Sequence, residues 1–488
     1  VTREPELRGL SINLVYQVHN DFPVIRKWVE LHNNSQTWLK VSELVIDDLD
    51  LDEAFRHQVL LTPSERGAGS SIIGFGNHSQ TTGVVCASEV PSALRSIGPT
   101  GAMGYNPEHF EWILGPGESF VSEPVFMFGY AGEVIETVSA RSFPLDRVIE
   151  RPFQAFLETH LGVAATQVES ASPVWCTWTN FAENIDDAII REQAEIAARC
   201  GFKTLQIDDG WQHDRLGVTP NPETFPDFEA TSRYVRSQGL RLGLWVSCFR
   251  SRDSQDLQVL PGAASVPEIR RLDGVAMSFA SPWSEYFGHQ LAGLHDQYGA
   301  SYFKLDFTNV KYGDFSRENE SRSKKESLLR GLRGLLRSQE VLRQQAPSVS
   351  NQITHEIYWG TPGVPCDLAA IKHAVTYHIP PNDYSGTVHW KQRFGASDVW
   401  TKADPAKLAA ELIQGCYNAR QRFYEHRGLP LESVEYYGAA TINANGSLSP
   451  EIQDRQVCSW LMGAPMVFAG DLTSLTEENI HRYRNRFE

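Results

Sequence analysis

Aspartates stand at the ends of several apolar segments of this 488-residue chain. The positions are Asp208 and Asp209 after TLQI, Asp306 at the end of SYFKLD, and Asp398 in GASDVW. An unpaired buried charge is costly, so carboxylates directly after buried strands are expected to have partners or a task. Each could instead cap the following helix, but repetition on several strands favours a shared site. Two carboxyl groups that flank a glycosidic bond could cleave it, one ionised and one protonated.

Asp306 has the surroundings of the ionised group. Lys304 lies two residues earlier on the same predicted strand, so both side chains point to one face of the sheet. A neighbouring positive charge favours the carboxylate form. Asp398 suits the role of general acid and base, provided that its surroundings raise its pKa.

Three tryptophans lie at or near the ends of the predicted strands: Trp178, Trp211 and Trp245. An indole face at such a place could stack on a sugar ring. Core packing is the alternative for each of them, because tryptophan buries a large apolar area.

The pattern of the elements changes along the chain. Residues 1–168 predict an N-terminal antiparallel β-sandwich domain, because their half-apolar alternating strands need a second sheet to cover them. In residues 169–488, short apolar segments alternate with helices expected near 186–200, 229–238 and 284–298. This alternation predicts βαβ units and an α/β fold, a (β/α)8 TIM barrel. The carboxyl ends of barrel strands open into one mouth, which would gather the aspartates.

Composition excludes some classes of function. The net charge of −16 argues against a broad nucleic-acid surface or an anionic-membrane surface. The basic and acidic residues of 318–345 predict an amphipathic helix with a solvated charged face. No apolar stretch reaches the roughly 18–20 residues that span a bilayer, so no membrane partner is expected.

The seven cysteines are widely spaced and form no CxxC pair, so neither a zinc site nor a disulfide framework is predicted. Buried reduced thiols are the simpler interpretation. The proposed chemistry needs no metal or organic cofactor. The chain opens with Val1, so a leader could have been removed; we expect a soluble protein, with the cytoplasm favoured over secretion.

Four segments resemble glycoside hydrolase family 36, the melibiase-type α-galactosidases together with the raffinose synthase and seed-imbibition-like proteins. WCTW (175–178) resembles the family's first barrel strand, and IDDGWQ (207–212) its second, whose two acids contact galactose O4 and O6. KLD (304–306) is similar to the K-x-D signature of the nucleophile, and ASDVWTKADP (396–405) to the acid/base segment. The usual C-terminal β domain is expected to be absent.

The resemblance implies Asp306 as nucleophile and Asp398 as acid/base of a retaining α-galactosidase. It also implies sugar contacts from five residues of the pocket: Asp208, Asp209, Lys304, Trp178 and Trp245.

Trp211, Asp383 and Arg393 are also predicted to belong to the sugar site. Asp383 in PPNDYSG is expected to contact the sugar, and it is the rival acid/base because the interval from Asp306 to Asp398 is longer than the family spacing. Arg393 could be the arginine that precedes the acid/base in the family, at a different offset.

Several alternatives stay open. One is a raffinose-synthase-like transglycosidase, and another is an enzyme for a different glycone, an α-N-acetylgalactosaminidase or α-glucosidase. A carbohydrate-binding relative without catalysis belongs to a different class. The expected partner is a carbohydrate, an α-galactoside or oligosaccharide, and a homo-oligomer is compatible with the sequence.

Overall fold

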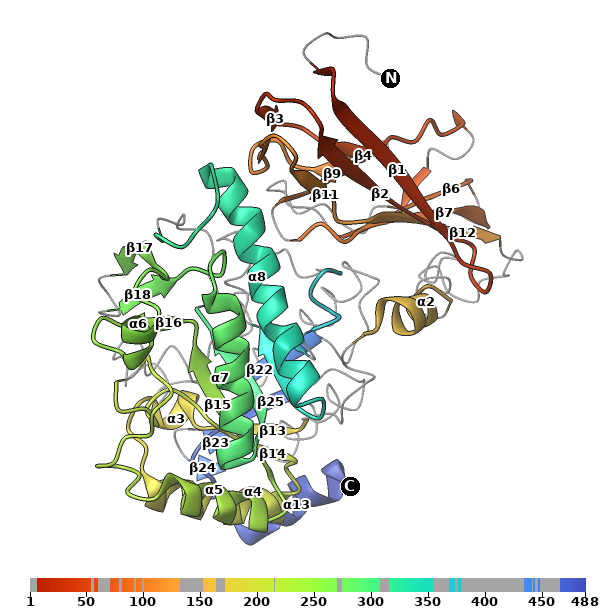
Figure 1. Ribbon diagram of the computed structural model, residues 1–488. Coiled ribbons are helices and arrows are strands. Elements are labelled where there is room, and N and C mark those ends of the chain that lie inside the picture. The colour runs from red at the N-terminus through yellow and green to blue at the C-terminus, as the bar shows by residue number, and fades with distance from the viewer. Residues whose placement is uncertain are drawn as a thin grey trace.

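The computed structural model describes the following residues: 7–53, 57–59, 71–78, 81–91, 94–98, 101–131, 152–163, 172–214, 216–269, 274–307, 316–353, 368–373, 376–378, 434–440, 442–443, 446–447 and 466–488. Figure 1 shows antiparallel strands from the first part of the chain beside a group of parallel strands and helices from the rest.

The first part of the chain forms antiparallel sheets. The largest has the order β1 (Leu10–Val18), β2 (Val24–Asn33), β12 (Val125–Ala131), β7 (Thr82–Ser88), β6 (Ile72–Gly76) and β5 (His57–Val59), with β11 (Ser119–Val121) also paired to β2. The smaller sheets are β4 (Val45–Asp47), β9 (Met103–Tyr105) and β8 (Arg95–Ile97), and β10 (Trp112–Leu114) with β3 (Leu39–Val41). Alternate residues such as Val29, Leu31 and Phe120 are buried, as the two-residue period of the strands requires.

The second part forms a closed ring of eight strands, and every neighbouring pair runs parallel. The order is β13 (Val174–Cys176), β14 (Thr204–Ile207), β15 (Arg241–Ser247), β19 (Ala300–Asp306), β20 (Ser350–Ile353), β21 (Thr376–His378), β22 (Val434–Ala440) and β25 (Met466–Ala469). The last strand returns to the first, because Val174 pairs with Val467. The predicted α/β class is therefore confirmed.

Helices follow several strands of the ring at the predicted places. The longer ones are α4 (Asp187–Cys200), α5 (Phe228–Ser237), α7 (Trp283–Tyr298), α8 (Lys324–Gln345) and α13 (Glu477–Phe487). Asp186 and Asp227 begin α4 and α5, since each side chain accepts a hydrogen bond from the backbone amide three residues on. Gly201 ends α4 in the left-handed conformation, at φ 86°.

Shorter elements connect these parts. They are α2 (Gln154–Phe156), the π-helix η5 (Leu157–Leu161), α3 (Trp178–Phe181), α6 (Gln255–Val259), η10 (Leu472–Ser474), the sheet β16 (Phe249–Ser251), β18 (Gly274–Met277) and β17 (Ala264–Ile269), and the pair β23 (Ile442–Asn443) and β24 (Gly446–Ser447). No helix in these described parts is both long enough and apolar enough to cross a bilayer.

The charged face of α8 was predicted to be solvated, and the structure differs on this point. The helix forms, but its arginines are not all solvated, because several of them hold the antiparallel sheets. Arg333 donates to Glu123 at 2.5 Å, and the Arg330 guanidinium lies 4.6 Å from the centre of the Trp112 ring. Figure 1 shows this end of α8 beside β11. The charges therefore join the two parts of the chain.

Close packing of α7 and α8 provides a test of the fold. A Cβ at Gly334 of α8 would overlap the carbonyl oxygen of Phe279, whereas a Cβ at Gly293 of α7 would meet nothing within 4 Å. We expect Gly334→Ala to lower the free energy of unfolding by about 1–3 kcal/mol, because the overlap outweighs helix propensity. Gly293→Ala should raise it by up to about 1 kcal/mol. Denaturant unfolding of both variants measures this, and equal effects would contradict the packing.

Candidate active site

The predicted acidic residues of the second and fourth ring strands lie at the carboxyl ends of those strands. Asp208 and Asp209 directly follow β14, and Asp306 is the last residue of β19. Both members of the acidic pair are buried, with 1% and 3% of their surfaces exposed, while Asp306 is half-buried. Parallel strands of a ring place these ends on one side, so the three carboxylates belong to one end of it.

Asp208 accepts hydrogen bonds from three side chains on three strands. Its Oδ2 atom accepts from Gln206 Nε2 at 2.7 Å, from Cys176 Sγ at 3.2 Å and from Lys304 Nζ at 3.0 Å. The other oxygen, Oδ1, accepts from the backbone amide of Asp209 at 3.0 Å. Such a set of donors compensates for the lost hydration of a buried carboxylate.

Lys304 pairs with a carboxylate that the sequence did not indicate as its partner. The sequence placed its ammonium beside Asp306, two residues along the same strand. The ion pair that the structure shows joins Lys304 to Asp208, with both side chains 2% exposed, and the proximity of Lys304 to Asp306 stays a prediction. The lysine side chain is long enough to reach over from β19 towards β14, although β15 lies between these strands in the ring.

Asp306 is held by two donors of a different kind. Trp245 Nε1 donates to Oδ2 at 3.0 Å, and the backbone amide of Phe307 donates to Oδ1 at 2.8 Å. Phe307 has a φ of 55°, in the left-handed region that a phenylalanine rarely adopts. The ring of Phe307 stacks on that of Phe249, with centroids 5.3 Å apart. Both oxygens of Asp306 are therefore oriented by the surrounding chain.

The three predicted tryptophans occupy different environments. Trp178 is half-buried and packs against the cluster that contains Cys176. Trp245 contacts Asp306 through its ring nitrogen. Trp211 is fully buried, its ring stacks on Phe228, and its indole N–H donates to the carbonyl of Trp245. Trp211 is therefore packed in the core, and its contact with a sugar stays a prediction.

Arg250 stabilises the segment directly after β15, and sequence reasoning missed it. The guanidinium is fully buried and donates to the carbonyls of Ser247 and Phe249. It forms an ion pair with Asp256 and lies 4.9 Å from the centre of the Trp283 ring. An arginine in the polar stretch FRSRDS gave no sign of burial.

Cys176 and Gln206 were also missed as neighbours of the predicted carboxylates. A signal existed for Gln206, because it lies two residues before Asp208 and a strand places such residues on one face. Asp383, Arg393 and Asp398 lie outside the described residues.

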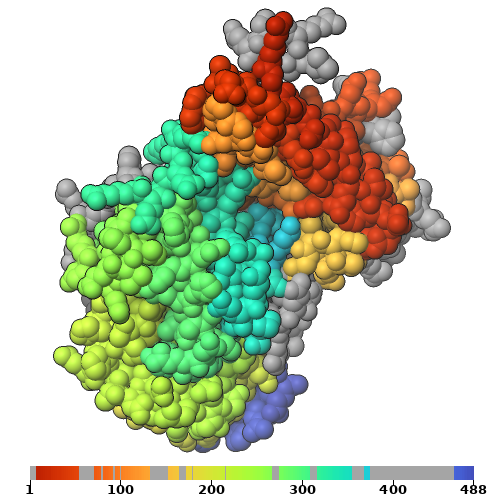
Figure 2. All heavy atoms as spheres, viewed as in Figure 1, coloured from red at the N-terminus to blue at the C-terminus, as the bar shows by residue number. Residues whose placement is uncertain are grey.

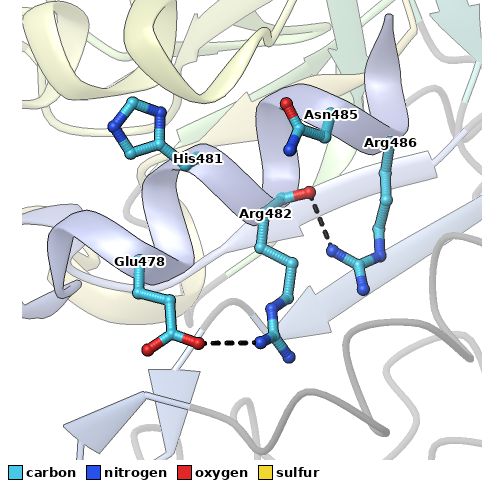
Figure 3. Close-up of a pocket in the computed structure, with 5 residues that line it drawn as sticks. All are labelled: Glu478, His481, Arg482, Asn485 and Arg486. Carbon is cyan, nitrogen blue, oxygen red and sulfur yellow. Dashed lines mark hydrogen bonds and ion pairs between the residues drawn. The ribbon is translucent and has the colours of Figure 1, made fainter.

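A cavity of about 730 Å³ lies elsewhere, on the outer side of α13 (Figure 3). Its lining comprises Glu478, His481, Arg482, Asn485 and Arg486. The opposite side of the helix, which includes Ile480, Tyr483 and Phe487, is buried. This cavity is therefore separate from the carboxylates at the strand ends.

Relatives were found by sequence, although no family model matches the chain. The chain is 27% identical over 364 residues to α-galactosidase C of Emericella nidulans, a match covering 61% of this chain and 46% of that protein. It is 24% identical over 242 residues to a probable α-galactosidase C of Aspergillus flavus, covering 45% of this chain and 31% of that protein. The chain thus spans less than half the length of these relatives.

Solved structures show the same fold. The glycoside hydrolase family 36 α-galactosidase AgaA of Geobacillus stearothermophilus, solved with stachyose, matches with a TM-score of 0.69 at 16% identity, covering 99% of this chain and 67% of that one. The α-galactosidase of Lactobacillus brevis gives 0.67 at 16% identity, covering 98% and 64%. By fold, the chain resembles the family 36 glycoside hydrolases. The family resemblance predicted from the four sequence segments is therefore confirmed. Its sequence relatives named above are α-galactosidases or probable ones.

The buried ion pair yields a prediction on stability. Lys304→Met would leave the charge of Asp208 buried without its cation, so we expect the free energy of unfolding to fall by about 3–5 kcal/mol. The matched control is Arg233→Met, which breaks an exposed ion pair with Glu229 and should cost less than about 1 kcal/mol. Denaturant unfolding compares the two. Equal losses would show that the buried pair contributes no more than a surface one.

Proposed function

We propose that this chain is the catalytic part of an α-galactosidase that hydrolyses terminal α-galactosides with retention of configuration. The observation that carries the proposal is the position of Asp306: it ends β19, its two oxygens are oriented by Trp245 and the amide of Phe307, and the carboxylates after β14 belong to the same end of the ring. The α-galactosidases among its relatives support the choice of galactose.

The proposed reaction has two displacements. Asp306 attacks C1 of the sugar as the bond to the leaving oxygen breaks, and the acid, Asp398, protonates that oxygen. In the second step Asp398 takes a proton from water, whose oxygen attacks C1 and releases Asp306. Asp383 is the rival for the acid/base role.

The sugar would be held by charged groups. Asp208, Asp209 and Lys304 would read its hydroxyls, and Trp178 and Trp245 would contact its ring. A site that hydrogen-bonds an axial hydroxyl discriminates against an analogue without it, because the buried polar groups would lose their partners. Arg393 stays a predicted contact. Stachyose, present in the AgaA structure, shows the kind of oligosaccharide to test.

We propose two domains for this protein. Residues 1–168 would form a β-sandwich, and residues 169–488 would form a complete (β/α)8 barrel. The described ring and the antiparallel sheets are compatible with both.

The first test is of the nucleophile. We expect Asp306→Ala to lower kcat/KM on an aryl α-galactoside by at least about 10³-fold, since the covalent route is lost. Asp296→Asn, an exposed carboxylate of α7, is the control and should leave the rate unchanged. A 2-fluoro galactosyl fluoride should label Asp306, as peptide mass spectrometry would show. Turnover by Asp306→Ala at the normal rate would refute the assignment, and net inversion followed by NMR would refute retention.

A second test separates Asp398 from Asp383. Removing the acid/base slows reaction by about 10²–10⁴-fold when the leaving group needs protonation. We expect Asp398→Gly to spare aryl galactosides with acidic leaving groups, to lose stachyose hydrolysis, and to regain rate with azide as a galactosyl azide forms. Asp383→Gly should instead raise KM without azide rescue. The reverse pattern would assign the role to Asp383.

Assays with related substrates distinguish the proposed hydrolysis from the alternative functions. A panel of aryl α-glycosides compares galactose with glucose and N-acetylgalactosamine as the glycone. Galactosyl transfer to added sucrose at the expense of hydrolysis would favour the raffinose-synthase-like reaction. Sugar binding without turnover would indicate a binding protein.

A further inference from the structure

Two histidines and an aspartate meet far from the candidate active site, at the tip of the β1–β2 hairpin. His19 directly follows β1, Asp21 lies in the turn before β2, and His160 belongs to η5. One ligand atom from each of the three side chains lies within 4.8 Å of the others. Figure 2 shows the segment that contains η5, coloured gold, against the red N-terminal strands.

The spacing of two of these atoms suits a shared cation. His160 Nε2 and Asp21 Oδ2 are 2.9 Å apart, joined by a hydrogen bond. Ligand bonds of about 2.0–2.2 Å in a tetrahedral site would place neighbouring ligand atoms about 3.3–3.6 Å apart, so these two atoms would need to separate by less than about 1 Å. A metal ion could therefore replace the shared proton with little movement. The imidazoles of His19 and His160 lie with ring centroids 4.3 Å apart.

His19 supplies an independent observation. Its Nε2 atom is buried, and within the described part of the chain it has no hydrogen-bond partner. A buried polar atom of this kind costs free energy unless something binds it. Metal binding would give this nitrogen a partner, because a neutral imidazole coordinates a cation through a ring nitrogen.

An apolar layer fixes the two imidazoles. Phe156 contacts both, with centroids 5.2 Å from the His19 ring and 5.5 Å from the His160 ring. Phe22 packs edge-on against His160 at 5.4 Å. Such a layer limits the movement of the ligands before the cation arrives. The nearby positive charge of Arg26 is balanced by its ion pair with Glu89 at 2.7 Å.

We propose that His19, Asp21 and His160 form a binding site for a divalent transition-metal ion that joins the β1–β2 hairpin to η5. Two imidazole nitrogens and one carboxylate oxygen suit Zn²⁺, Ni²⁺ or Cu²⁺ better than Mg²⁺ or Ca²⁺, which prefer oxygen ligands. The remaining positions of the ion would take water. The ligands are spread over two distant segments, so no sequence motif announced the site.

The test uses the full chain, freed of metal with EDTA, and Zn²⁺ alone as the probe. We expect one Zn²⁺ to bind per chain in calorimetry and to raise the thermal midpoint of unfolding. His160→Ala and His19→Ala should each weaken binding at least about tenfold. His289→Ala, which removes an exposed histidine of α7, is the control and should bind like the parent.

Cu²⁺ provides a readout that does not depend on stability. Its electron paramagnetic resonance spectrum should show coupling to two nitrogens in the parent and to one in His160→Gln, a variant chosen to keep a polar side chain in η5. Mg²⁺ should not compete for the site. Unchanged Zn²⁺ affinity in both histidine variants, absence of binding in the parent, or a spectrum without nitrogen coupling would each overturn the proposal.

Discussion

The buried ion pair between Lys304 and Asp208 is the interaction on which the arrangement of the site depends. Two charges that are each 2% exposed have lost their water, and their attraction repays that loss only with good geometry and further hydrogen bonds. Gln206 and Cys176 supply those bonds. The pair links β14 with β19 past the intervening β15, so a shift of either strand by one residue would bury an unpaired charge.

Buried charges also join the antiparallel sheets to the ring. Glu89 is 3% exposed and pairs with Arg26 of the same sheet and with Lys372 of the later segment, each at 2.7 Å. Burial raises the pKa of Glu89, but Lys372 and then Arg26 outweigh that effect and lower it overall. Arg333 of α8 pairs with Glu123 in a less buried position, with the arginine side chain 35% exposed and the glutamate 16%. Charged hydrogen bonds between the antiparallel sheets and the ring require a defined geometry. They therefore fix the relative position of the two parts more specifically than apolar contacts alone would.

The sequence predicted what depends on local pattern. The strand that ends at Asp306 and the helices expected near 186–200 and 284–298 followed from the alternation of apolar and helical segments. Partners that meet only in three dimensions did not follow. The ion pair of Lys304 with Asp208 was not foreseen, because the reach of this side chain towards β14 has no signature in the sequence. Burial of Arg250 was equally hidden, since an arginine among polar residues normally lies at the surface.

Neighbouring residues of the chain fix the orientation of the Asp306 carboxylate. Phe307 next to it has a φ of 55°, a conformation that costs on the order of 1–3 kcal/mol and persists only where the surroundings require it. Here the ring of Phe307 stacks on Phe249, whose carbonyl accepts from the buried Arg250. The strained turn directs the amide of Phe307 at Asp306 Oδ1. The carboxylate is thus positioned by the packing of the residues around it, so its orientation does not rely on contact with a bound sugar.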